Sequence, residues 1–460
     1  MTGARGWLVL VALVVAAYLP FLGGGFLTDD FVHIDRLTHA SGSGEVVNAP
    51  DAFGFFRPVT QASLYLESLI HPAAAPFFRL TNVVLEVLVV IAAFATARLL
   101  LNAMSAAALA TLIFALTPKA HPIAVLWISA RGELLMSLFA LVATWAWIVW
   151  TRGGGRRWLA TAIVAYALAI LSKETAFLLP AALLVAPGAT MPLRRRAAMA
   201  AVMIGVAAVA FAWRIAAGAL VPSTSDSHYM LATPLFRWGR NARNYFWRLL
   251  PEPLAAVILV GIAGVLQRRS RDRERGTMNA QPATGAPEQR TTNLLFAMAW
   301  VAVFLLPVLP VVARNELYLY LPAFGMSILA VHLIATSLDL VSPSRHIQAA
   351  VVIFAIVCGA YQVSRSWQMH DELVFSGKLV DALAGVPGAG VVLLVGDDEE
   401  TRRLLKDTIG GYLPAVLRRA APDGRLIASE SGDASLPGVV RLRCSYHDRG
   451  LVLISQETSQ

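Results

Sequence analysis

The chain has 460 residues, of which 57% are hydrophobic and only 15% are charged, and its mean hydropathy is +0.62. Soluble globular domains carry about 25% charged residues, so this composition excludes an ordinary soluble protein and predicts a polytopic membrane protein. The net charge of +9 does not indicate nucleic-acid binding, because the basic residues lie in short segments between apolar runs, as the positive-inside rule requires. Cys358 and Cys444 form no pattern for a disulfide framework or a metal site.

The first apolar stretch, 7–27, is too long for the core of a signal peptide and has no small-residue cleavage site after it, so we expect a retained signal anchor. The acidic pair Asp29 and Asp30 follows directly. Charge beside hydrocarbon is costly, and a carboxylate pair that leaves a first span is therefore a candidate functional site. The alternative is that the pair only marks where water begins.

Further apolar stretches bring the prediction to about eleven membrane spans, several of them shorter than the ~20 residues that a perpendicular helix needs. They lie at 80–101, 103–116, 133–150, 158–171, 176–185, 197–220, 254–266, 294–312, 318–334 and 347–363. The segment 267–293 is rich in Gly, Pro, Ala, Gln and Thr and is predicted to be a disordered linker.

Arginines predict the orientation. If the N-terminus is cytoplasmic, every short inner segment is basic, including 152–157, 194–196 and 268–275. The large loops 28–79 and 221–253 and the tail then lie outside. We therefore expect a multi-pass protein of a bacterial inner (plasma) membrane, with a membrane domain at 1–364 and a small extracytoplasmic domain at 365–460.

Positive charges also occur at the outer ends of the spans, where they would converge on the outer mouth of the bundle. They are Arg57, Arg79, Lys119, Arg131, Lys173, Arg237, Arg240, Arg243, Arg248 and Arg314. Guanidinium groups grip phosphate oxygens, so such a mouth would suit a lipid-linked phosphate. Contact with membrane lipid phosphates is the alternative for each of them.

Three outer features have open alternatives. Lys173-Glu174 is either an ion pair at the mouth or a helix start capped by Ser172 with Glu174 in the first turn. His121 either orients a substrate or pairs with loop backbone. Tyr318 fits an interfacial aromatic belt more readily than a sugar-stacking platform.

The tail is predicted to be a small α/β unit, with strands at 391–395, 439–444 and 451–454 and a helix at 397–409. The acidic run after Gly396 lacks the glycine spacing and the lysine of a phosphate-binding loop, so it indicates an acidic helix start.

Six blocks of the sequence, in order, together resemble the GT-C-type membrane glycosyltransferases, and most closely the transmembrane O-mannosyltransferases with tetratricopeptide repeats. The blocks are FLTDDF at 26–31, FRPVTQASL at 56–64 with FRLTN at 78–82, WISARGELL at 127–135, LSKETA at 171–176, ELYLYLP at 316–322 and SWQMHDEL at 366–373. They cover about residues 20–375. The repeats themselves are missing, because no period of about 34 residues appears in 381–460.

The resemblance implies a mainly α, polytopic helical bundle that transfers a sugar, with a mannose-like hexose favoured, from a polyprenyl-phosphate donor to a hydroxyl of a protein or glycan acceptor. It also implies inversion at the anomeric carbon. Such a transfer needs a carboxylate to accept the hydroxyl proton and cations to stabilise the departing phosphate. Asp29 or Asp30 is the natural base, with a slight preference for Asp30.

The expected donor and substrate ligands are Arg57, His121, Arg131, Lys173, Glu174, Arg314 and Tyr318. No cofactor is certain: two adjacent carboxylates can hold a divalent cation, but without a third ligand they are a weak metal signal. A lipid or glycan transporter would place charges at mid-bilayer and show internal repeats. A membrane scaffold would tolerate the loss of both aspartates. Those are the two rival functions.

Overall fold

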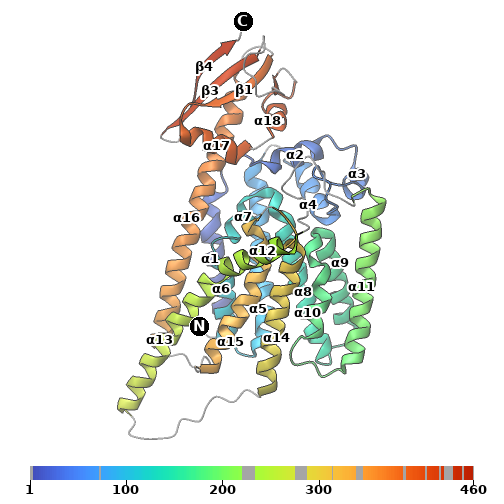
Figure 1. Cartoon of the computed structure of the whole chain (residues 1–460), viewed down its shortest axis with the longest axis vertical. Coiled ribbons are helices and arrows are strands. Elements are labelled where there is room, and N and C mark those ends of the chain that lie inside the picture. The colour runs from blue at the N-terminus through green and yellow to red at the C-terminus, as the bar shows by residue number, and fades with distance from the viewer. Residues whose placement is uncertain are drawn as a thin grey trace.

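The computed structural model is a helical bundle with a small α/β unit at one end (Figure 1). The structure describes residues 4–71, 74–219, 234–274, 287–312, 314–337, 345–386, 390–409, 412–423, 426–428, 439–447 and 450–458. The expected mainly α, polytopic architecture is therefore confirmed. The N-terminal helix begins at the end of the bundle that lies away from the α/β unit (Figure 1).

Apolar helices of different lengths make up the bundle. They are α1 (Ala4–Tyr18), α5 (Ala75–Leu101), α6 (Met104–Ala115), α8 (Arg131–Thr151), α9 (Arg156–Ser172), α10 (Leu179–Leu184), α11 (Leu193–Ala216), α13 (Pro251–Glu274), α14 (Pro287–Leu305), α15 (Tyr320–Ser337) and α16 (Arg345–Ala384). Short helices join them: η1 (Leu19–Phe21), α7 (His121–Leu126), η2 (Ile128–Ala130), η3 (Glu174–Leu178), η5 (Leu306–Val308) and η6 (Glu316–Leu319).

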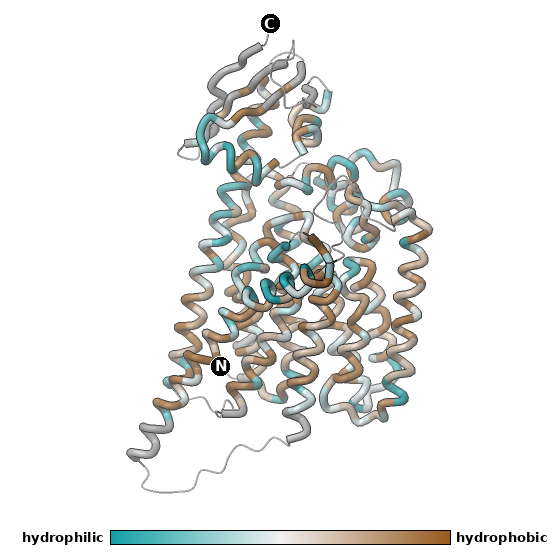
Figure 2. Tube along the Cα trace, in the orientation of Figure 1, coloured by the Kyte–Doolittle hydropathy of each residue, from teal (hydrophilic) through white to brown (hydrophobic). Residues whose placement is uncertain are grey.

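Within the described ranges, seven helical segments are long and apolar enough to cross a membrane, and three shorter apolar helices accompany them. Hydrophobic residues dominate the bundle in Figure 2, whereas α17 (Glu399–Ile409) in the α/β unit is largely hydrophilic. The prediction of about eleven spans remains a prediction, because length and composition alone give this smaller set.

Residues that favour helix ends explain where α5 begins and ends. Pro76 stands in its first turn, where a missing N–H costs nothing. Asn102 ends the helix in the left-handed conformation, with φ of 53° and its N–H bonded to the Arg98 carbonyl at 3.0 Å. Inside the bundle, the buried Trp147 and Trp300 each satisfy the indole N–H with a backbone carbonyl at 2.9 Å.

The two large loops that the sequence analysis expected on the extracytoplasmic side contain helices. The loop 28–79 forms α2 (Asp29–Thr38), α3 (Ser43–Asn48) and α4 (Pro58–Ser68), which lie at the same end of the bundle as the α/β unit (Figure 1). The loop 221–253 forms α12 (Leu235–Leu249). The predicted linker 267–293 is wrong at both ends, because α13 continues to Glu274 and α14 begins at Pro287. Its remaining part, 275–286, lies outside the described residues.

The α/β unit has a four-stranded sheet of order β2-β1-β3-β4. β2 (Leu426–Ala428), β1 (Gly390–Gly396) and β3 (Val439–His447) are parallel, and β4 (Gly450–Thr458) is antiparallel to β3. The strands and the helix expected from the sequence are all present, whereas α18 (Leu413–Ala420) and β2 were not predicted. α16 runs unbroken from the bundle into this unit, past the predicted boundary at 364 (Figure 1).

Candidate functional site

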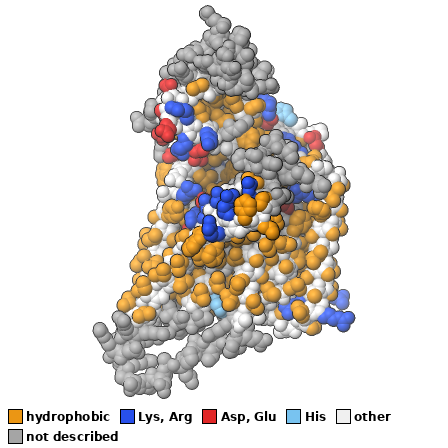
Figure 3. Space-filling view, viewed as in Figure 1, with side chains coloured by type: hydrophobic (Ala, Val, Ile, Leu, Met, Phe, Trp, Pro, Cys, Tyr) orange, Lys and Arg blue, Asp and Glu red, His pale blue; other side chains and the backbone are white. Residues whose placement is uncertain are grey.

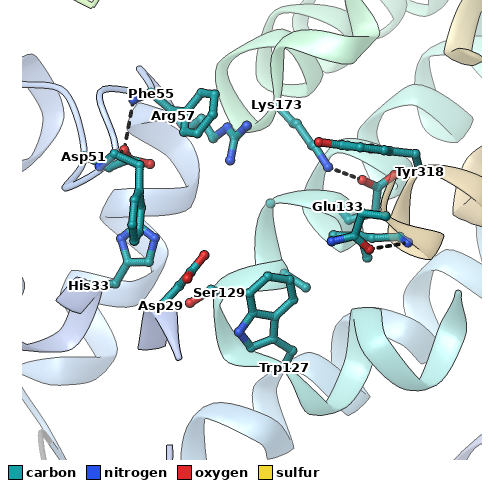
Figure 4. A pocket seen from close by; sticks show the side chains of 15 residues that line it. Asp29, His33, Asp51, Phe55, Arg57, Trp127, Ser129, Glu133, Lys173 and Tyr318 are labelled. Atoms are coloured by element: carbon teal, nitrogen blue, oxygen red, sulfur yellow. Dashed lines mark hydrogen bonds and ion pairs between the residues drawn. The ribbon is translucent and has the colours of Figure 1, made fainter. Parts of the chain in front are cut away.

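A cavity opens at the end of the bundle that carries α2, between α2, the loop before α4, the start of α8, the end of α9 and η6. Its charged and titratable lining residues are Asp29, His33, Asp51, Arg57, Glu133 and Lys173. Figure 4 shows Asp29 on one side, with Arg57, Lys173 and Tyr318 across the space from it. The cavity therefore combines a carboxylate with two cations on separate structural elements.

The two aspartates of the acidic pair point in different directions. They are the first two residues of α2, and successive helix residues are about 100° apart around the axis. Asp29 lines the cavity. Asp30 is fully buried and accepts three hydrogen bonds, from the Leu27 N–H at 3.1 Å and from the Ser129 N–H and hydroxyl at 2.7 and 2.5 Å. The geometry therefore reverses the slight preference for Asp30 as the substrate-facing carboxylate.

Burial raises the pKa of the Asp30 carboxyl above its ordinary value, and the hydrogen bonds from Ser129 and Leu27 oppose that rise. The two bonds from Ser129 join α2 to η2, and the bond from Leu27 closes the turn before α2. Asp30 is thus a structural link that fixes the start of α2, and the side chain of its neighbour Asp29 is directed into the cavity as a result.

The turn that precedes α2 is strained. Thr28 has φ of 38° and ψ of −109°, a region that favours glycine. Its N–H donates to the carbonyl of Thr408 in α17 at 2.7 Å. The Ser376 hydroxyl of α16 donates to the Phe26 carbonyl. α17 and the part of α16 that extends into the α/β unit therefore contact the segment from which Asp29 projects.

Arg79 holds the same segment from below. Its guanidinium is buried and donates to the carbonyls of Leu22 at 2.8 Å, Gly23 at 3.0 Å and Gly25, as well as to Leu126 on α7. The sequence predicted Arg79 at the outer mouth as a phosphate ligand. In the structure its donors are used by backbone carbonyls, so it positions the chain that leads to Asp29.

The two cations of the cavity are each oriented by a carboxylate. Lys173 lies 2.5 Å from Glu133 and over the ring of Tyr318, 5.1 Å from its centroid. Arg57 makes a bidentate contact with Glu174, at 2.9 and 2.6 Å. Such paired cations keep fixed positions while their remaining N–H groups face the cavity.

This pairing corrects both alternatives for Lys173-Glu174. The two side chains do not pair with each other, because each has another partner across the cavity wall. Ser172 is not a cap either: its hydroxyl donates to the Leu168 carbonyl at 2.7 Å, and Lys173 is the residue that precedes η3. Glu174 does stand in the first turn of η3, as expected.

Arg131, His121 and Arg314 do not line the cavity. Arg131 is fully buried, 2.5 Å from Glu67. His121 is also fully buried, with its Nδ1 atom 2.8 Å from Glu86 and its ring beside Tyr320. Arg314 is exposed next to the cavity-lining Asn315. The expected role as donor or substrate ligands does not fit the first two, because both are buried away from the cavity. His121 pairs with the Glu86 side chain and not with loop backbone.

Sequence reasoning missed His33 and Glu133 as site residues. His33 lies one helical turn after Asp29, a spacing that places both side chains on one face of α2. Its Nδ1 atom is buried without a hydrogen-bond partner among the residues that the structure describes, and its ring packs edge-on against Phe53 with centroids 5.1 Å apart. Burial lowers the pKa of His33, with the nearby Asp51 opposing. The i, i+4 spacing from Asp29 was the signal available in the sequence.

Asp51, Trp127 and Ser129 were also missed. The Asp51 carboxylate accepts the N–H groups of Phe53 and Phe55, both at 2.9 Å, and so shapes the loop that carries Arg57. In the part of the chain that the structure describes, no group of three or more His, Cys, Asp or Glu side chains is arranged to hold a metal ion.

Comparison with known proteins supports this architecture. No family model matches the chain. A protein O-mannosyl-transferase of Caenorhabditis elegans is 26% identical over 156 residues, which are 31% of this chain and 22% of that protein. The match thus spans about a fifth of the length of that relative.

Two solved structures of ArnT from Cupriavidus metallidurans are similar over 97% of this chain and 94% of theirs, at 12% identity. The TM-score is 0.52 for the form bound to undecaprenyl phosphate and 0.54 for the apo form. At this identity the likeness concerns the fold. The chain therefore has a GT-C-type fold, as its sequence resemblance implied.

Proposed function

We propose that this chain is an integral membrane glycosyltransferase that moves a sugar from a polyprenyl-phosphate donor to a hydroxyl of a protein or glycan acceptor. The observation that carries the proposal is the placement of Asp29 across one cavity from Lys173 and Arg57. The bound undecaprenyl phosphate of the similarly folded ArnT supports a polyprenyl-phosphate donor. The partial match to an O-mannosyl-transferase makes mannose the first sugar to test.

The proposed reaction is a single displacement. Asp29 accepts the proton of the acceptor hydroxyl, whose oxygen forms the new bond to the anomeric carbon. The bond from that carbon to the phosphate oxygen breaks, and its electron pair stays on the phosphate. Lys173 and Arg57 neutralise the phosphate as it leaves. Attack opposite the leaving group gives inversion.

The other lining groups have supporting roles in this mechanism. Glu133 and Glu174 keep the two cations in place through the contacts described above. His33, one turn from Asp29, lines the same cavity, where its ring can contact the acceptor or the sugar. The edge of Tyr318 and the ring of Trp127 supply apolar walls to the cavity.

The test uses the full chain in proteoliposomes with radiolabelled polyprenyl-phosphate mannose and a soluble acceptor peptide that carries hydroxyl side chains, and it measures the transfer of label into the aqueous phase. Asp29→Asn keeps size and hydrogen bonding but cannot accept the proton, so transfer should fall about 100-fold or more. Asp35→Asn is the matched control. Asp35 is on the same helix but pairs with Arg418 at 2.9 Å, outside the cavity. Full activity in the Asp29→Asn variant would remove Asp29 as the base, and no transfer by the unaltered chain would remove the enzyme hypothesis in favour of transport or a scaffold.

We also propose that the cavity and the α/β unit face the extracytoplasmic side. The basic segments at the opposite end of the helices support this orientation. An alkaline-phosphatase fusion after Gln460 should be active, and one at Gly276 should be inactive. The reverse pattern would invert the assignment.

A further inference from the structure

α12 is an amphipathic helix on the flank of the bundle. Its sequence, LFRWGRNARNYFWRL, has four arginines and no acidic residue. It lies crosswise to the long helices (Figure 1), and its arginines form the central basic patch on the face seen in Figure 3, with hydrophobic side chains next to them. The proposed reaction does not use this patch.

The inward side of α12 is fixed to the protein. The Asn241 side chain donates to the carbonyls of Leu309 and Val311 at 2.9 and 3.0 Å. Tyr245 and Leu249, one and two turns further on, are buried. Arg248 pairs with Glu316 of η6 at 2.9 Å. The orientation of the helix is therefore set, and so is the direction in which its other side faces.

That other side combines charge with exposed apolar surface. Arg240 and Arg243 are exposed and three residues apart, so they lie next to each other on the helix surface. Leu235, Phe236 and Trp247 are 75%, 69% and 66% exposed. Exposure of so many large apolar side chains to water is costly. Arginines beside exposed aromatic and aliphatic side chains are typical of helices that lie in the interface of a membrane.

We propose that the outer face of α12 binds the headgroups of anionic phospholipids. Arg240 and Arg243 contact the phosphates, and Leu235, Phe236 and Trp247 enter the boundary between headgroups and acyl chains. The excess of positive charge selects anionic over zwitterionic lipid. The exposed rings favour a lipid surface over an acidic protein. An acidic protein surface would match the arginines but would offer no apolar partner to the rings.

The test measures phosphatidylglycerol binding to the purified full chain by native mass spectrometry, with phosphatidylcholine as the zwitterionic comparison. The double variant Arg240→Gln/Arg243→Gln should bind phosphatidylglycerol about tenfold more weakly, since each arginine near a membrane surface contributes several-fold in affinity. Arg402→Gln/Arg403→Gln is the matched control. These two arginines are also exposed on a helix, but on α17 of the α/β unit. It should bind like the unaltered chain.

Raising the salt concentration should reduce the difference between the α12 variant and the unaltered chain, because the contact is electrostatic. Equal phosphatidylglycerol binding by all three proteins would overturn the proposal. Selective loss of polyprenyl-phosphate binding, with phosphatidylglycerol unaffected, would assign the patch to the carrier lipid instead. Binding of soluble polyglutamate without binding of phosphatidylglycerol would assign it to an acidic protein partner. The thermal midpoints should agree, which excludes misfolding.

Discussion

The charged residues around the cavity and those buried in the bundle beside it use the same residue types in opposite ways. The Arg131–Glu67 pair has side chains that are 0% and 7% exposed, whereas those of the Arg57–Glu174 pair are 18% and 25% exposed. In the buried set, protein groups satisfy the charges. In the cavity set, Arg57 is oriented by Glu174 and still lines the open space. A charge at the end of a span is thus not by itself evidence of a ligand site.

The largest expected effect is a difference in stability between a variant of the buried set and a variant of the cavity set. Arg131→Gln leaves the Glu67 carboxylate buried without its partner, so the free energy of unfolding should fall by about 3–5 kcal/mol. Arg57→Gln breaks a partly exposed pair and should cost about 1 kcal/mol or less. Thermal denaturation of the detergent-solubilised variants measures both. Equal midpoints for the two variants would show that the distinction between buried and cavity charges has no energetic basis.

The second effect concerns the two neighbouring aspartates. In Asp30→Asn the amide NH₂ must face one of the N–H or O–H donors of Leu27 and Ser129, so stability should fall by about 2 kcal/mol. Asp29→Asn should leave stability within about 0.5 kcal/mol while it removes transfer. In denaturation and transfer assays, Asp30→Asn should therefore show the larger loss of stability and Asp29→Asn the larger loss of transfer. A stable, inactive Asp30→Asn would return the base to Asp30.

The sequence predicted the acidic pair, its end of the bundle and three of the four described strands of the tail, because each depends on local pattern. It could not decide between Asp29 and Asp30. That choice depends on where α2 begins, which is fixed by Arg79 from α5 and by Thr408 from α17, far away along the chain. The partners of Lys173 were hidden for the same reason, since Glu133 is on another helix. His33 alone had a local signal, its helical spacing from Asp29.

A smaller effect tests the strained turn before α2. Thr28 has φ and ψ values that glycine adopts without strain, so Thr28→Gly should raise the free energy of unfolding by about 1 kcal/mol. The same change loosens the segment that carries Asp29, so kcat should fall severalfold with KM for the donor unchanged. Ala substitution at Thr38, at the other end of α2, is the control for a helix-terminal threonine. A rise in both stability and kcat would show that the strain has no part in positioning Asp29.

The smallest expected effect is a pH dependence of stability, which should come from the cavity residues and not from the buried charge pairs. Burial lowers the pKa of His33 below its ordinary value of 6.5, so the folded protein binds this proton less readily than the unfolded chain does. The stability that the neutral imidazole contributes is complete above pH 6.5 and is lost as the pH falls below it, by at most about 1.4 kcal/mol per unit. In the His33→Gln variant this loss should disappear, so the unfolding free energy should change less between pH 7 and pH 5.5 than it does in the unaltered chain. His39→Gln, which changes an exposed histidine just after the same helix, should keep the loss. An unchanged pH dependence of the unfolding free energy in the His33→Gln variant would mean that protonation of His33 does not destabilise the folded protein, and that His33 does not remain neutral beside Asp29.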